Sequence, residues 1–191
     1  MRVAAHAHGA DGIKAAIRAG IDTIEHASLV DAEGIRLAVA RKQPVWFSMD
    51  IYNTEYTQSE GKKNGTLEDN LRKDREIAQA QRDAFRAAHK AGVRMLFGSD
   101  AGVMPHGQVG RQFNTMVTYG MTPLQAIQAA TRNAAQALGR EKDVGAIAVG
   151  RFGDMVAVRG DPTANVRLLE AVDAVVKGGS LVPRAVPSAA R

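Results

Sequence analysis

The chain has 191 residues, of which 45% are hydrophobic and 24% charged, a composition typical of one globular domain or of a domain with a small appendage. No apolar run reaches the roughly 18 residues of a membrane span, and the stretch after Met1 lacks the length and cleavage site of a signal peptide, which favours a cytoplasmic protein. The absence of cysteine excludes disulfides, thiolate zinc sites and cysteine nucleophiles.

The net charge of +5 raises the question of a nucleic-acid partner. The basic residues alternate with acids, as in RKDREIAQAQRDAFRAAHK, and aromatic residues make up only 5% of the chain. This mixture is typical of a solvated helix face. We therefore expect neither a nucleic acid nor a membrane among the partners.

The first two-thirds of the sequence alternates short apolar runs with amphipathic stretches, a pattern typical of strands that are each followed by a helix. The expected strands are residues 2–5, 23–25, 44–48 and 93–97. The expected helices are residues 10–19, 31–41 (which Asp31 can cap), 67–91, 110–119 and 123–137, and residues 49–66 form a long polar loop. Four successive strand–helix units predict an α/β fold with a parallel sheet.

The pattern changes after Leu138, where Gly-punctuated strands follow one another without long helices. Residues 172–177 and 180–183 flank Gly178-Gly179, a pair suited to the positive φ of a tight hairpin turn. We therefore divide the chain into an α/β part at residues 1–138, a small β element at residues 139–185 and a tail at residues 186–191.

Side chains suited to metal binding or catalysis follow each expected strand. Functional groups gather at the carboxyl ends of strands in parallel α/β barrels, and imidazole and carboxylate are preferred ligands of zinc and similar ions. The residues at these ends are His6 and His8, His26, Ser48 and Asp50, and Asp100. Because side chains alternate between the two faces of a strand, we expect only one of His6 and His8 to point inward.

Structural interpretations stay open for these residues. A strand-end histidine such as His6 can hydrogen-bond a loop, and Asp100 in SDAG can cap a following helix. His89 is expected at a helix end, interacting with the helix dipole. For His106 three roles remain: substrate contact, metal binding or shaping of a turn.

Longer motifs resemble the amidohydrolase superfamily, more narrowly its imidazolonepropionase-like and Xaa-Pro dipeptidase-like branch. These motifs are VAAHAHGADGIKAAIRAGIDTIEHAS, FGSDAG with the following PHG, and YGMTPLQAIQAATRNAAQALG. The stretches GAIAVGRFGDMVAVRGDP and VDAVVKGGSLV resemble the C-terminal sandwich strands of that family. The resemblance covers essentially the whole chain, which corresponds to the C-terminal half of the usual family member.

The resemblance implies roles for individual residues. His6 corresponds to a metal ligand, and His26 to a second-metal ligand or substrate contact. Asp100 corresponds to the aspartate that binds metal and acts as catalytic acid and base on the attacking water. His8 is implied to hydrogen-bond a ligand or to contact substrate. Tyr52 is the candidate for holding a substrate's terminal carboxylate, although an ordinary loop tyrosine is the alternative. The implied cofactor is one or two divalent ions, with zinc favoured.

The family fold is a (β/α)8 barrel with a composite β-sandwich. Only four barrel strands can be counted here, and the HxH that opens the family's metal site is not found in its usual context. The resemblance therefore implies the C-terminal half of a TIM-like barrel, followed by a small β element of the sandwich. A half barrel leaves strand edges unpaired, so we expect a homo-oligomer or pairing with a complementing N-terminal half.

The function implied by the resemblance is hydrolysis of the C–N bond of a small peptide or cyclic amide by metal-activated water. An activity like that of a dipeptidase or carboxypeptidase is favoured over opening of an imidazolone ring. The alternative is a non-catalytic fragment or pseudoenzyme half that assembles with itself or with a complementing chain.

Overall fold

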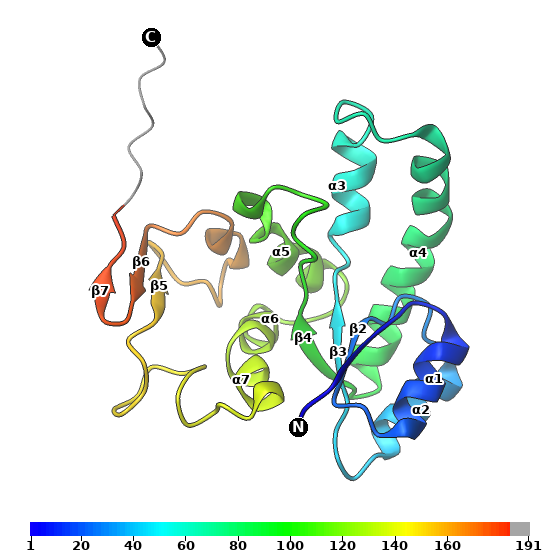
Figure 1. The fold of residues 1–191 in the computed structure, drawn as a ribbon. Coiled ribbons are helices and arrows are strands. Elements are labelled where there is room, and N and C mark those ends of the chain that lie inside the picture. The colour runs from blue at the N-terminus through cyan, green and yellow to red at the C-terminus, as the bar shows by residue number, and fades with distance from the viewer. Residues whose placement is uncertain (184–191) are drawn as a thin grey trace.

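The computed structural model describes residues 1–183, and Figure 1 shows the arrangement of their helices and strands. Four parallel strands form one sheet in the order β1-β2-β3-β4. Their bounds are β1 (Ala4–Ala7), β2 (Thr23–His26), β3 (Trp46–Met49) and β4 (Arg94–Phe97). The strands are in level register, so their carboxyl ends lie along one edge. The predicted α/β class and parallel sheet are confirmed.

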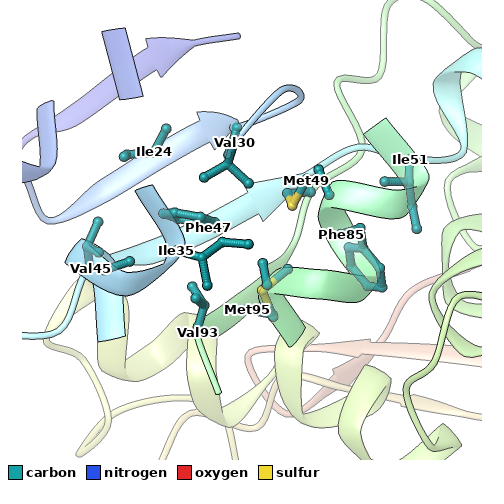
Figure 2. Close-up of a cluster of buried hydrophobic side chains, with 14 of the residues drawn as sticks. Ile24, Val30, Ile35, Val45, Phe47, Met49, Ile51, Phe85, Val93 and Met95 are labelled. Atoms are coloured by element: carbon teal, nitrogen blue, oxygen red, sulfur yellow. The ribbon is translucent and has the colours of Figure 1, made fainter. Parts of the chain in front are cut away.

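Seven α-helices accompany this sheet in the described residues. They are α1 (Ala10–Ala19), α2 (Ala32–Ala40), α3 (Asn53–Glu60), α4 (Glu68–Lys90), α5 (Arg111–Thr118), α6 (Pro123–Ala130) and α7 (Arg132–Leu138). A hydrophobic core lies between one face of the sheet and the helices, as Figure 2 shows. Ile24, Phe47 and Met95 occupy matching positions on three neighbouring strands, and all three are buried in this core. Burial of this face fixes the register, because a slip by one residue would turn the apolar side chains to the opposite face.

The structure differs from the sequence-based expectation between residues 49 and 66, where helix α3 lies in the expected loop. The helix has no apolar stripe, and its sequence NTEYTQSE is polar. Tertiary contacts stabilise the helix instead, and Asn53, Thr54 and Tyr56 are buried. Gln58 also donates hydrogen bonds to the Leu71 carbonyl oxygen and to the Asp74 carboxylate, both in α4.

The expected helix over residues 123–137 is two helices. The chain leaves helical geometry at Thr131, whose φ and ψ are −123° and −91°. The Thr131 hydroxyl donates to Ile127 O at 2.7 Å, a local bond of the kind that bends helices. The break brings Asn133 to β4, where its side chain donates to Met95 O at 3.1 Å.

A second sheet lies in the C-terminal part and has the antiparallel order β5-β6-β7. Its strands are β5 (Met155–Ala157), β6 (Ala174–Lys177) and β7 (Ser180–Leu181). The predicted hairpin is confirmed, with φ of 58° at Gly178 and 80° at Gly179. Residues 139–154, the first part of the expected β element, contain no strand, and the expected tail at residues 186–191 lies outside the described residues.

The C-terminal part is joined to the helices through the 3₁₀ helix η2 (Val166–Glu170), which packs against α5. Gly110 marks the closest approach, because a Cβ added there would lie 2.3 Å from the Leu169 carbonyl oxygen. A side chain at this position would therefore separate the two elements.

The amino ends of the strands lie opposite their carboxyl ends, along the lower edge of the sheet in Figure 1. Here Arg2 Nη1 donates to the carbonyl oxygen of Ala137 at 2.6 Å, which joins the start of β1 to the end of α7. Trp46 and Leu96 pack with Ala137 as well. Within residues 1–183 no helix has the length and apolar character needed to cross a bilayer.

Candidate metal centre

A pocket of about 340 Å³ lies at the carboxyl ends of the four strands. Each strand contributes, so residues far apart in the sequence meet because the parallel strands end at the same level. The lining residues are His6, Glu25, His26, Ser48, Asp50, Phe97, Gly98, Ser99 and Asp100. The three residues proposed as metal ligands from the sequence thus line one pocket.

The backbone is strained at two of these three candidate ligands. His26, Ala27 and Asp100 have φ of 71°, 46° and 45°, in the left-handed region that residues with a side chain rarely adopt. Each such residue costs ~1–3 kcal/mol and persists only where the surrounding structure enforces it. Here the backbone bends sharply at His26, where β2 ends, and at Asp100, in the turn that follows β4.

His6 and His26 lie with their ring nitrogens close together. His26 Nε2 is 3.1 Å from His6 Nδ1. Two imidazole nitrogens that share a tetrahedral zinc ion are about 3.3 Å apart, given Zn–N distances near 2.05 Å. The observed separation is therefore compatible with one cation held between the two rings.

Asp50 orients His26 by accepting a hydrogen bond from the second ring nitrogen of His26, Nδ1. The distance from His26 Nδ1 to Asp50 Oδ1 is 2.9 Å, and the side-chain amide of Asn53 donates to Asp50 Oδ2 at 2.7 Å. Asp50 is buried and its position is fixed from two sides. A carboxylate that accepts the Nδ1 proton leaves the Nε2 lone pair free for a cation, the usual arrangement behind a metal-bound histidine.

The described residues contain two groups whose potential ligand atoms lie within 4.8 Å of one another. One group is His6, His8 and His26, and the other is His26, Asp50 and Asp100. His26 belongs to both groups. Imidazole nitrogen with carboxylate oxygen is a donor set suited to a divalent transition metal such as zinc. The residues present therefore fit a divalent cation.

His8 contradicts the expectation that only one histidine of the pair points inward. Its ring lies 4.7 Å from His6 and is stacked at 4.4 Å on His26. The expectation was wrong because residues two positions apart lie on the same face of a strand, and only adjacent residues alternate. Burial lowers the pKa of His8, and the neighbouring His26 and His6 lower it further.

Two other candidates lie away from this pocket. Tyr52 is buried, and its hydroxyl contacts Gln108 and Arg111 at 3.4 and 3.3 Å. It lines a separate polar pocket of about 150 Å³ between α3, α5 and η2. His106 is exposed at the start of the 3₁₀ helix η1 (His106–Gln108) and lines neither pocket.

His89 occupies the last turn of α4, as expected for a helix-end histidine. Its surroundings act against the charge that a dipole interaction would favour, because burial lowers the pKa of its imidazole. Asp50 is the site residue that sequence reasoning places at a strand end without assigning it a role. The available signal was its position one residue after β3, at the level of His26.

Comparisons of the sequence with protein families and with known proteins agree on one family. The sequence profile of the Amidohydrolase family matches residues 1–182. Ochratoxinase from Aspergillus niger is 33% identical over 184 residues, which cover 94% of this chain and 37% of that enzyme. Imidazolonepropionase from Aeromonas hydrophila subsp. hydrophila is 34% identical over 93 residues, covering 47% of this chain and 23% of that protein.

Solved structures show the same relationship. A Xaa-Pro dipeptidase with bound methionine in the active site aligns with a TM-score of 0.87 and 38% identity, over 95% of this chain and 45% of that one. The crystal structure of A. niger ochratoxinase aligns with a TM-score of 0.78 and 31% identity, over 94% of this chain and 41% of that one. The chain thus spans less than half the length of these relatives. With a family profile that extends over nearly all of its residues and hydrolases as its relatives, the chain belongs to the amidohydrolase family.

Proposed function

We propose that the chain carries part of the active centre of a metal-dependent amidohydrolase that cleaves the C–N bond of a small peptide or amide. The observation that carries the proposal is the meeting of His6, His26 and Asp100 in one pocket, with Asp50 behind His26. Zinc is the favoured cation, because two imidazoles and a carboxylate form a typical catalytic zinc site. His26 is shared by both ligand groups and would serve a centre of one ion or of two.

The roles of the residues follow from their atoms. His6 and His26 would hold the cation through Nδ1 and Nε2, and Asp100 through a carboxylate oxygen. A bound divalent cation polarises the substrate carbonyl and lowers the pKa of water towards neutrality. Asp100 would accept the proton of the attacking water and deliver it to the leaving nitrogen, which balances the reaction.

A dipeptide or N-acyl amino acid is the proposed substrate class. The Xaa-Pro dipeptidase aligns over 95% of this chain, whereas the imidazolonepropionase relative covers only 47% of it. Tyr52 and His106 stay candidates for substrate contact only if the loops that carry them move towards the pocket.

We further propose that residues 1–138 are the C-terminal half of a (β/α)8 barrel and that residues 139–185 belong to a composite β-sandwich. Within residues 1–183, β1 and β4 each pair with one neighbour in the sheet. The structural relatives are about twice as long as the aligned part. A complementing N-terminal half, or a second copy of this chain, would pair with the free edges and supply the remaining ligands.

The test combines metal analysis with hydrolysis in the protein that contains this chain. We expect zinc or manganese to co-purify and to support cleavage of Xaa-Pro or Xaa-Arg dipeptides. The substitution Asp100→Asn should lower kcat by at least ~100-fold with an unchanged circular dichroism spectrum, since asparagine also tolerates the left-handed backbone. A wild-type rate in this variant would show that the proton transfer is misassigned. Absence of both metal and turnover would support the alternative of a non-catalytic fragment or pseudoenzyme half.

A further inference from the structure

A chain of hydrogen bonds runs from the interior of the molecule to His8. His8 Nδ1 lies 2.9 Å from the hydroxyl oxygen of Ser28, and the Gln81 side-chain amide donates to the same oxygen at 3.4 Å. Ser28 lies in the β2–α2 connection and Gln81 in the middle of α4, and both are buried. Among the hydrogen bonds of residues 1–183, neither side chain bonds to His6, His26 or Asp100, so the proposed metal centre alone does not explain them.

The donors and acceptors in this row of hydrogen bonds determine which group accepts the hydroxyl hydrogen of Ser28. A serine hydroxyl has one hydrogen to donate, and its oxygen already accepts from Gln81. Among the hydrogen bonds of the described residues, His8 Nδ1 is the acceptor within reach of the Ser28 hydroxyl. Ser28 is only 1% exposed, and a buried hydroxyl hydrogen without an acceptor is unfavourable. Ser28 therefore donates to His8 Nδ1, and the proton of neutral His8 lies on Nε2.

The orientation of the Gln81 amide decides this assignment, because the reversed amide would accept the hydroxyl hydrogen instead. His8 would then donate from Nδ1 and keep a free lone pair on Nε2. In the observed orientation the unpartnered Gln81 atom is the carbonyl oxygen Oε1. Reversal would instead leave the amide nitrogen, with two hydrogens, unpartnered in the interior. Unpartnered buried N–H groups are rarer than unpartnered carbonyls, which favours the observed orientation.

We infer that Gln81 and Ser28 are positioning residues that hold His8 as the Nε2–H tautomer, so that His8 presents a hydrogen-bond donor at the rim of the pocket rather than a cation ligand. Both ring nitrogens are then committed, although His8 belongs by distance to a possible ligand group. The His8 ring is kept in place by stacking at 4.4 Å on His26. The donor suits a carbonyl or carboxylate oxygen of a peptide or amide, a substrate role that rests on the proposed function; the tautomer does not.

The first experiment reads the tautomer directly in the metal-free protein labelled with ¹⁵N-histidine. Long-range ¹H–¹⁵N spectra at a pH where His8 is neutral, assigned with a His8→Gln variant, should show an acceptor-type Nδ1 and a protonated Nε2. Ser28→Ala should move the Nδ1 resonance towards that of an exchanging imidazole. If Ser28→Ala does not fold, Gln81→Leu is expected to perturb the same resonance. Gln79→Leu is the matched control, since Gln79 is an exposed residue of the same helix. A protonated Nδ1 in the wild-type protein would overturn the inference.

The second experiment separates a donor from a ligand. His8→Ala should leave the metal content unchanged and raise KM about three- to tenfold, the effect of losing one hydrogen bond. A fall in bound metal in this variant would identify His8 as a ligand and overturn the donor role. If the wild-type protein hydrolyses no dipeptide, the proposed function fails, whereas the spectra and the metal content still decide the inference.

Discussion

At the scale of single residues, Asp50 links the histidine-lined pocket to the protein interior. One carboxylate oxygen accepts from His26 and the other from Asn53. With both oxygens occupied in this way, its role in the metal-free structure is to fix the tautomer and direction of His26. Whether Nε2 of His26 offers a lone pair to a cation therefore depends on Asp50, a residue that is itself buried.

Replacement of Asp50 tests this dependence. Asp50→Asn places an amide group against a partner that is also a donor, so one of the two hydrogen bonds is lost. We expect zinc affinity to fall about 10- to 100-fold, measured by competition with a chromophoric chelator, while the thermal unfolding profile keeps its shape. Asp83→Asn, on the exposed face of α4, is the control and should bind zinc like the wild type. Equal affinity in both variants would assign Asp50 a structural role only.

The sequence allowed prediction of only some of these residue positions. The proximity of His6, His26 and Asp100 in one pocket is predictable because level strand ends in a parallel sheet leave little freedom. The direction of Tyr52 depends on α3 and on contacts with residues more than 50 positions away, which no local pattern encodes. The spacing of His6 and His8 does carry a signal for their grouping, because residues two positions apart lie on the same face of a strand.

At the scale of elements, an ion pair joins the first two helices. Asp31 caps α2 by accepting from the Gly34 backbone at 2.7 Å and also accepts from Lys14 of α1 at 2.8 Å. The Lys14 hydrogen bond, followed by the Gly34 backbone bond, lowers the pKa of Asp31. The same pair, with help from Asp11, raises the pKa of Lys14.

The pH dependence of stability follows from these shifts. Because the pKa of Asp31 is lower in the folded state, its stabilisation is present above about pH 4 and is lost as the pH falls through the folded-state value. The raised pKa of Lys14 keeps its contribution intact below about pH 10. Asp31→Asn retains the cap and removes the charge. We expect the variant to unfold at lower urea concentration at pH 7, with the difference vanishing near pH 2; a constant difference would contradict the ion-pair explanation.

Contact between α5 and η2 gives a second test at this scale. Gly110 has an ordinary helical φ of −59°, so alanine is conformationally allowed there, but its Cβ would meet Leu169 O and Glu170 Cα. We expect Gly110→Ala to cost ~1–3 kcal/mol in the free energy of unfolding and to increase hydrogen exchange in residues 166–170. Gly107→Ala, where nothing lies within 4 Å of the added carbon, is the control. Equal stability of the two variants would show that the elements separate at little cost.

Most elements of the α/β part could be predicted from the sequence because their helices are amphipathic and their strands apolar. The expected helix at residues 10–19 agrees with α1 at both ends. Helix α3 could not be predicted, since its stability comes from packing on α4 rather than from periodicity. The division at Thr131 lacked a signal as well, because neither glycine nor proline marks it in QAATRNAAQA.

At the scale of the whole molecule, the sheet edges and the C-terminal part expose surface that a soluble monomer normally covers. Strands β1 and β4 are edges of the parallel sheet within the described residues. The C-terminal part adds exposed apolar side chains, namely Ile147, Val149, Phe152, Val156 and Leu181. Free edges and apolar patches both promote association.

We therefore expect the 191-residue polypeptide, expressed by itself, to form assemblies larger than its 20.3 kDa monomer. Light scattering coupled to gel filtration measures the mass. Ala4→Lys places a charge on an exposed position of the β1 edge and should reduce assembly. Ala19→Lys, at the exposed end of α1, should not. A monodisperse monomer of the unmodified polypeptide would contradict the proposed need for a partner.

The bond from Arg2 to Ala137 has a practical consequence for handling the protein. It anchors the first residues at the lower edge of the sheet, away from the histidine-lined pocket at the upper edge. A fusion partner attached ahead of Met1 would start on the side of the sheet remote from the pocket histidines. A compact fluorescent fusion at this position therefore suits zinc titrations better than a polyhistidine tag, whose imidazoles bind zinc themselves wherever the tag lies.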